Sequence, residues 1–276
     1  MSKWHFWIDR GGTFTDIVAQ SPTGRLITDK LLSENPDKYK DAAIHSIRNL
    51  MQVEKNSKIP VSLIGSIKMG TTVATNALLE RKGEPVGLIT NNGYADSLEI
   101  GFQARPSLFA REIKKPDLLY RRVIELDVRV DSKGNELSYL NKKETKEKLL
   151  HLFDAGIRSI AVVFMHSYKF PKHEKQVGII AKKIGFKQIS LSHEVSPLVK
   201  FISRGDTTVT DAYLSPLLHR YVEQIRSVFD DNLNQLNLLF MTSSGGLTSA
   251  NLFRGKDAIL SGPAGGIIGA IKTSEY

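Results

Sequence analysis

Residues near the start of the chain carry the chemical groups needed to bind an anion and a metal ion. An apolar run ends in Asp9, and Gly11, Gly12 and Thr13 separate it from a second, alternating run that contains Asp16. This pattern predicts a strand, a tight turn and a second strand. Glycines let backbone N–H groups approach an anion closely, and a carboxylate at a strand end can hold a hydrated Mg²⁺. An ordinary β-hairpin with a glycine turn and two solvated acids fits the same residues.

A second polar junction follows the apolar run that ends at Met69. Gly70, Thr71 and Thr72 stand between this predicted strand and a helix predicted over residues 77–82. Backbone N–H groups and hydroxyls at a helix start can bind an anion, and ligands of α/β sheets lie beyond the carboxyl ends of the strands. Capping of the helix by either threonine is the alternative.

These two segments resemble motifs of the hydantoinase/oxoprolinase family. DRGGTFTD at residues 9–16 is similar to the family's first phosphate motif, and GTTVATNALLERKG at residues 70–83 matches nearly residue for residue. The resemblance covers essentially all 276 residues. Further matching segments are GFQARP at 101–106, HSY at 166–168, SLSHEV at 190–195, MTSSGG at 241–246 and SGPAGG at 261–266.

The resemblance implies an α/β fold of the ribonuclease-H-like, actin-like ATPase type, with a mixed sheet and helices on both faces. Three strands, a helix, a strand, a helix and a strand, predicted over residues 4–90, are the order expected of such a domain. The family domain is expected over residues 1–200. Residues 201–276 are expected to form a linking helix and the first elements of a truncated second domain.

The resemblance also implies an activity. Members of this family use ATP to activate a cyclic amide or a related carbonyl compound, as in the opening of 5-oxoproline or N-methylhydantoin. It therefore implies an ATP-dependent hydrolase of the hydantoinase or oxoprolinase type, with ATP and Mg²⁺ as cofactors and a small cyclic amide as substrate. The implied site residues are Asp9 for the metal; Gly11, Gly12, Thr13, Asp16, Gly70, Thr71 and Thr72 for ATP; Thr75, Asn76 and Arg105 for the substrate; and His166 for catalysis.

For three polar residues later in the chain, a structural role is the alternative to a role in the site. A lone histidine after a buried strand, such as His166, is more often a hydrogen-bonded structural residue. The guanidinium fork of Arg105 matches a carboxylate, but this residue lies in an irregular stretch and fits a surface position equally. His193 beside Glu194 suggests metal or acid/base chemistry, yet no second histidine stands at a ligand spacing. We expect an exposed turn with a helix cap there.

Composition limits the other classes of function. Lysine and arginine number 38 against 29 acids, a formal charge of +9, but the basic residues are dispersed over predicted helix faces and match no nucleic-acid motif. We therefore expect a solvated surface and no nucleic-acid partner. The sequence contains no cysteine, no long apolar run and no signal peptide, so we expect a cytoplasmic protein without a membrane partner.

Two features separate this sequence from the family pattern. The family's second DxGGT phosphate motif has no copy here, and Phe201-Ile202-Ser203 stands where relatives carry a glutamate before the arginine. We therefore expect half a catalytic cleft, which binds nucleotide weakly and turns over little. The expected partners are a second hydantoinase-type subunit, a missing C-terminal domain or another copy of the chain. The alternative function is a non-catalytic nucleotide-binding or subunit-assembly module.

Two helices are predicted from apolar spacing and proline positions. One begins at Asn35-Pro36 and extends to about Val53. The other follows Ser203, and Pro216 should kink or divide it, with Ser215 as the second cap.

Overall fold

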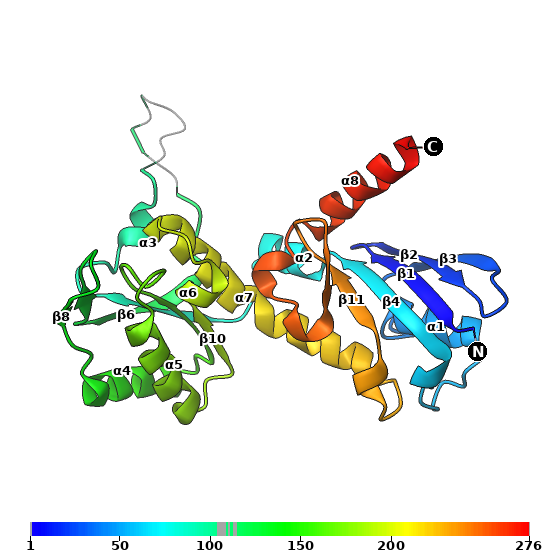
Figure 1. Ribbon diagram of the computed structural model, residues 1–276, viewed down its shortest axis with the longest axis horizontal. Coiled ribbons are helices and arrows are strands. Elements are labelled where there is room, and N and C mark those ends of the chain that lie inside the picture. Colours follow the sequence, from blue (N-terminus) through cyan, green and yellow to red (C-terminus); the bar gives the residue numbers. More distant parts are fainter. Residues whose placement is uncertain (1, 104–108, 110, 113–114, 276) are drawn as a thin grey trace. The chain divides into compact units, whose positions relative to one another are not determined.

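The computed structural model describes residues 2–103, 109, 111–112 and 115–275 (Figure 1). The chain packs into two compact units, residues 1–82 with 217–276 and residues 83–216, which we call the terminal unit and the central unit. This division by packing differs from the predicted segments 1–200 and 201–276, because strands from both ends of the chain join one sheet.

The terminal unit is built on a six-stranded mixed sheet. The strand order is β12-β11-β4-β1-β2-β3, in which β1, β4 and β11 are parallel and β1, β2 and β3 form an antiparallel meander. The carboxyl ends of the three parallel strands therefore share one edge. The strands are β1 (Trp4–Arg10), β2 (Phe14–Gln20), β3 (Leu26–Leu32), β4 (Ile64–Thr71), β11 (Leu238–Met241) and β12 (Leu247–Ser249).

Helices lie on both faces of this sheet. On one face, α1 packs on the meander, and Tyr221 of α7 contacts Phe240 of β11. On the other, Gly265 in α8 lies beside Met241, the next residue of the strand. The helical elements of the unit are α1 (Ala42–Met51), η1 (Val61–Leu63), α2 (Val73–Leu79), the end of α7 (Phe201–Arg226), η2 (Leu233–Gln235), η3 (Ala250–Leu252), η4 (Gly255–Asp257) and α8 (Ser261–Ser274).

The first helix begins later than its sequence predicts. Apolar spacing predicts a helix over residues 35–53, but α1 starts at Ala42. The Asp41 carboxylate accepts a hydrogen bond from the Ile44 N–H (3.1 Å). N–H groups in the first turn have no partner within the helix, so this bond fixes where α1 begins. The prediction read the apolar residues before this cap as part of the same helix.

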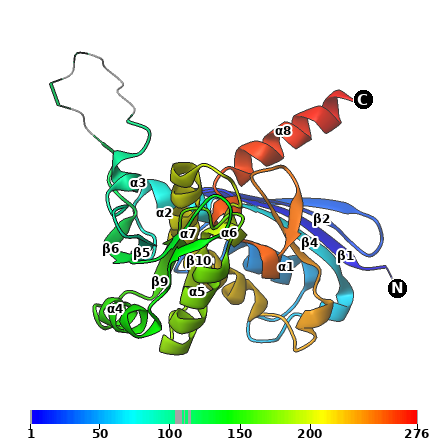
Figure 2. The same cartoon turned by 60° about the vertical axis from the view of Figure 1, so that its left-hand side comes forward.

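The central unit contains a parallel four-stranded sheet of order β10-β9-β5-β6. Helices α4 and α5 pack side by side on one face (Figure 2), around a core that includes Leu149, Ile160 and Val177. The first half of α7 contacts Ser159, which points to the other face. The elements are β5 (Val86–Asn91), α3 (Ser97–Ile100), β6 (Tyr120–Leu126), α4 (Lys142–Asp154), β9 (Ser159–Val163), α5 (Lys172–Ile184), β10 (Gln188–Leu191), α6 (Ser192–Val195) and the β7–β8 ribbon (Arg129–Val130, Glu136–Ser138).

The assignment of β5 to the first sheet was wrong. The predicted order places it as the strand that completes the sheet of β1 to β4, but it pairs with β6 and β9 in the central unit. The strand beside β4 is β11, which follows the whole central unit in sequence. Local patterns cannot distinguish the two, because both strands are short and apolar.

The long helix α7 runs through Pro216 as one helix, so of the two predicted outcomes, a kink or a division, the division was wrong. Proline lacks the N–H that would bond the carbonyl of Ala212, four residues earlier. That carbonyl instead accepts a hydrogen bond from the Ser159 hydroxyl (2.6 Å). Ser215 caps no second helix, and its hydroxyl donates to Asp211 Oδ1 (3.0 Å). In the described part of the chain, no helix has the length and hydropathy of a membrane span.

Candidate functional site

The turn between β1 and β2 exposes backbone donors. Gly11 N–H donates to the Phe14 carbonyl (3.0 Å), and a Cβ atom on Gly11 would lie 2.8 Å from that oxygen. Ser33 fixes the turn from beneath, because its hydroxyl donates to the Gly11 carbonyl (2.7 Å) and its N–H to the Thr13 carbonyl (2.8 Å). Among the described residues, the N–H groups of Gly12 and Thr13 have no hydrogen-bond partner. The tip therefore presents two N–H donors to solvent.

Two carboxylates stand beside this turn. Asp9 and Asp16 are direct cross-strand partners, so both side chains lie on the solvent-exposed face of the sheet. Like charges in this position repel unless a cation balances them. Lys30 Nζ lies 2.7 Å from Asp16 Oδ1 and balances one of the two. Asp9 has no such partner in the described chain, and it lies next to Gly70, where a Cβ atom would approach its Oδ1 to 3.2 Å.

These two carboxylates are the acids available to a cation at the turn. Across the described residues, no group of three or more His, Cys, Asp and Glu side chains is arranged to hold a metal ion. Mg²⁺ retains several waters and takes one or two carboxylates, so Asp9 with Asp16 fits that ion. Zn²⁺ or Ca²⁺ would need ligands that this turn does not offer.

The β4–α2 junction packs against the turn. Thr72 donates from its N–H (3.1 Å) and its hydroxyl (3.3 Å) to the Arg10 carbonyl. Asn76 Nδ2 donates to the Thr72 hydroxyl (3.4 Å), and a Cβ atom on Gly12 would lie 3.2 Å from the same nitrogen. The structure thus brings Gly12, Thr72 and Asn76 together, beside Asp9 and Gly70. Helix α2 begins at Val73, earlier than the predicted residues 77–82.

Two threonines of this junction are engaged inside the fold. The Thr71 side chain is buried, and its hydroxyl accepts from the Val73 N–H (3.2 Å), whereas Thr72, the N-cap residue of α2, makes no capping hydrogen bond with its side chain. The Thr75 hydroxyl donates to the Ile259 carbonyl (2.6 Å), just before α8. Ser261, the first residue of α8, donates to the Thr71 carbonyl (3.1 Å). The matching motif SGPAGG therefore joins the same edge of the sheet as the first turn.

His166 belongs to the central unit, at the carboxyl end of β9. Its backbone has φ of +60°, a left-handed conformation that is uncommon for residues other than glycine. Its ring is half-buried and lies 6.3 Å from the Tyr168 ring, and none of the hydrogen bonds of the described residues involves it. Such strain persists only where the surroundings enforce it. Arg105 lies outside the described residues.

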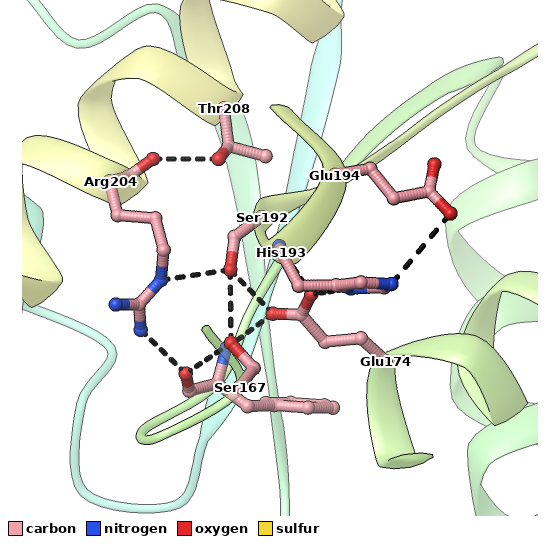
Figure 3. A network of polar contacts seen from close by, with 8 residues as sticks. Ser167, Glu174, Ser192, His193, Glu194, Arg204 and Thr208 are labelled. Carbon is pink, nitrogen blue, oxygen red and sulfur yellow. Dashed lines mark hydrogen bonds and ion pairs between the residues drawn. The ribbon is translucent and has the colours of Figure 1, made fainter. Parts of the chain in front are cut away.

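A buried polar network enforces this turn (Figure 3). Glu174 of α5 is fully buried, and its Oε1 accepts from the Phe164 N–H (3.0 Å) and the Ser192 hydroxyl (2.6 Å). Its Oε2 accepts from the N–H (3.0 Å) and the Nδ1 (2.7 Å) of His193. From the neighbouring strand β5, Asn91 Oδ1 accepts from the Met165 N–H (2.7 Å).

Arg204 of α7 completes the network. Its guanidinium is buried and donates to the Ser192 hydroxyl (3.0 Å) and to the carbonyls of Phe164 (2.8 Å) and Leu198 (2.6 Å). Burial lowers the pKa of this group, and the negative charge of Glu174 opposes that shift. The residues on the N-terminal side of His166 are thus held through both their N–H and their carbonyl groups.

The prediction of an exposed turn at His193 was wrong. Its side chain is only 9% exposed, because Glu174 extends from α5 and pairs with Nδ1. Sequence analysis did not single out Glu174 or Arg204. One signal was present: Glu174 occupies a position on the apolar side of the α5 pattern, with Val177 and Ala181, where a charge requires a buried partner.

Comparison with known structures defines the class of fold. The chain superposes on the crystal structure of ATP-dependent caprolactamase from Pseudomonas jessenii with a TM-score of 0.76 and 28% identity, covering 94% of this chain and 39% of that one. A nucleotide-free acetone carboxylase gives a TM-score of 0.77 at 23% identity, over 98% of this chain and 40% of the other. These likenesses and the mixed sheet confirm the predicted α/β fold of the actin-like, ribonuclease-H-like type.

The sequence identifies the family within this class. The hydantoinase/oxoprolinase N-terminal region matches residues 5–185, and a second hydantoinase/oxoprolinase region matches residues 204–276. The chain therefore belongs to the hydantoinase/oxoprolinase family, as the motifs predicted.

Individual relatives are longer than this chain. The 5-oxoprolinase of Dictyostelium discoideum is 45% identical over 98% of this chain and 24% of its own length. The 5-oxoprolinase 1 of Arabidopsis thaliana is 43% identical over 98% of this chain and also 24% of its own length. The caprolactamase subunit alpha of Pseudomonas jessenii is 30% identical, over 96% of this chain and 39% of the relative. The chain thus spans about a quarter of the 5-oxoprolinases it matches.

Proposed function

We propose that this chain forms the nucleotide-binding part of an ATP-dependent enzyme that opens a small cyclic amide of the 5-oxoproline or hydantoin type. The observation that carries the proposal is the β1–β2 turn, where the N–H groups of Gly12 and Thr13, without a partner among the described residues, stand beside Asp9. This combination suits a phosphate group with its divalent cation. The relatives named 5-oxoprolinase and ATP-dependent caprolactamase support the chemistry.

Each residue of the turn has a role in this proposal. Gly12 and Thr13 would bind phosphate oxygens, with Gly70 and Thr72 bordering the same space. Asp9 and Asp16 would hold Mg²⁺, and the Lys30 ion pair leaves Asp9 as the carboxylate with the stronger need for a cation. Asn76 would orient a phosphate or a substrate carbonyl through its amide, with Thr75 supporting the helix that carries it. When bound, ATP would supply the phosphoryl group that activates the amide carbonyl oxygen.

His166, in the central unit, is the candidate for a general base or an electrostatic clamp. Its ring is free of internal hydrogen bonds among the described residues, whereas the backbone around it is fixed by Glu174 and Arg204. A side chain held in this way is available for a ligand without losing its position. Arg105 remains the candidate for a substrate carboxylate.

The active site would be completed by a further hydantoinase-type segment or subunit, since the matched relatives are longer and one of them is a subunit. Three exposed residues of α8 would pack against this further segment or subunit: Ile267, Ile268 and Ile271. The same isoleucines favour the second candidate function, a nucleotide-binding or assembly module without catalysis. The cysteine-free sequence suits a cytoplasmic setting.

The test is an assay of ADP release in the presence of 5-oxoproline, hydantoin or caprolactam. The chain is assayed alone and with the remaining region of a 5-oxoprolinase added. We expect amide-dependent ADP release from the mixture, lost in Asp9→Ala and in His166→Ala. Complex formation that survives Asp9→Ala, without ADP release under any condition, would support the assembly module and overturn the enzymatic proposal.

A further inference from the structure

We propose that a pocket between α1 and the end of α7 binds a small, multiply charged anion of the phosphate type. The pocket has a volume of about 430 Å³ and lies wholly within the terminal unit. Its basic lining consists of Lys38, Lys40, Arg48 and Lys55. It lies on the α1 side of the sheet, whereas Asp9 points to the opposite face, because successive strand residues alternate. The pocket is therefore separate from the β1–β2 turn.

The positive charge of the pocket is not balanced by its own acids. None of its three lysines forms an ion pair with any of the described residues. The carboxylate in the lining, Asp41, is only 1% exposed, and both of its oxygens already have partners. Its Oδ1 accepts from the Ile44 N–H, and its Oδ2 lies 3.4 Å from Arg10 Nε. A bound anion would meet uncompensated cations.

The arginine in the pocket is fixed in place before any ligand arrives. Arg48 Nη1 donates to the carbonyls of Glu54 and Ser57, both at 2.7 Å. These bonds tie the guanidinium to the loop that also carries Lys55, so less conformational freedom is lost when it binds an anion. Its other N–H groups remain available in the described structure.

His45 adds a neutral donor between the lysines. Burial lowers the pKa of this ring, and Lys55 and Lys38 lower it further, against the opposing effect of Asp29. The Asn49 amide nitrogen lies 3.0 Å from Nε2 and donates to it, which places the ring proton on Nδ1. The ring stacks on Tyr39 at 4.5 Å between centroids. Nδ1 therefore carries the ring proton, and none of the hydrogen bonds of the described residues uses it.

A lining of cations and N–H donors selects an acceptor-rich ligand with more than one negative charge. Orthophosphate, pyrophosphate or a phosphoryl group on a larger molecule has this chemistry, and the volume suffices for any of them. Uncharged or cationic ligands would leave the lysines unpaired. The shared feature is the phosphoryl group, and the source is decided by experiment.

The test follows the His45 ring by NMR while orthophosphate, pyrophosphate or ADP is added to the chain. We expect a saturable shift of the His45 signal and a rise in its pKa, because a bound anion offsets the two lysines that disfavour the charged ring. The exposed His151 in the central unit should not respond, and Asp9→Ala should leave the response unchanged. If pyrophosphate binds as tightly as ADP, the ligand of the pocket is a free anion. If ADP binds more tightly, the ligand is a phosphoryl group on a larger molecule.

Matched variants make this test specific. The double variant Lys38→Gln with Lys55→Gln should weaken anion binding by about fivefold for each lysine removed. This factor corresponds to the attraction of about 1 kcal/mol between two unit charges in contact in water. Lys143→Gln with Lys146→Gln, two exposed lysines of α4, changes the net charge equally and should have no effect. The proposal is overturned if the His45 signal does not saturate with any of the three anions, or if both double variants behave alike.

Discussion

The substitution Glu174→Gln tests whether the buried network holds the turn before His166. Glu174 accepts four hydrogen bonds, two on each carboxylate oxygen. Glutamine keeps one oxygen, and its amide nitrogen would face the other two donors. Two charge-assisted hydrogen bonds are lost at about 1.5–3 kcal/mol each, and Arg204 loses its nearby negative charge. We therefore expect the stability of the central unit to fall by about 3–5 kcal/mol, which is the usual cost of breaking a buried ion pair.

Hydrogen exchange is the suitable measurement, because one unfolding curve would mix the two units. Both tryptophans, Trp4 and Trp7, lie in the terminal unit, so fluorescence reports only that unit. We expect amide exchange in segments 159–168 and 188–195 to speed up by about a thousandfold, the equivalent of about 4 kcal/mol. The tryptophan transition should hardly move.

The control for this prediction is Glu147→Gln, which removes an exposed acid from α4. It should leave exchange in both segments within error of the parent chain. Unchanged exchange in Glu174→Gln would refute the argument that this carboxylate holds the turn. Equal acceleration in the terminal unit would refute the argument that the network acts locally.

Three further predictions test other parts of the structure. Gly11→Ala places a methyl group 2.8 Å from a backbone oxygen and should destabilise the terminal unit by about 1–3 kcal/mol, measured by tryptophan fluorescence in urea. Ser159→Ala leaves the Ala212 carbonyl unpaired at a cost of about 1–3 kcal/mol, and Pro216→Ala, which restores an N–H donor, should recover part of it in a double-mutant cycle. The Lys172 ammonium and the His173 imidazole, both bonded to Glu136, lower the pKa of this carboxyl below its ordinary value of 4.5. Its stabilising contribution is therefore present above pH 4.5 and lost as the pH falls below it, and Glu136→Gln should remove this part of the acid sensitivity, seen in thermal melts between pH 3 and pH 6.

Local signals were enough to predict the first turn and most strands. The glycine pair after an apolar run specifies a hairpin within a few residues, and β1, β2 and β3 follow the predicted meander. The Asn141 cap of α4 is likewise local, because its side chain accepts from the Lys143 and Glu144 N–H groups. Each of these features depends on contacts between residues close together in sequence.

The errors at β5, Pro216 and His193 share a cause, because each depends on a partner that is distant in sequence. Nothing near β5 shows that β11, after the central unit, pairs with β4. Pro216 is tolerated in α7 because Ser159, from another element, satisfies the carbonyl that it leaves open. Glu174 and Arg204 appear as surface charges until the fold brings them to the same turn. Such pairs arise from tertiary structure, and no local propensity encodes them.

The central claim is that the β1–β2 turn binds the phosphates of ATP, and calorimetric titration of the chain with MgATP tests it most directly. We predict saturable binding that is lost in Asp9→Asn, which removes the carboxylate beside the turn, and in Gly12→Val, whose side chain would meet Asn76. Asp154→Asn, at an exposed acid of α4, should bind like the parent chain. Binding that is equal in all four proteins, or absent from the parent at millimolar nucleotide, would contradict the account.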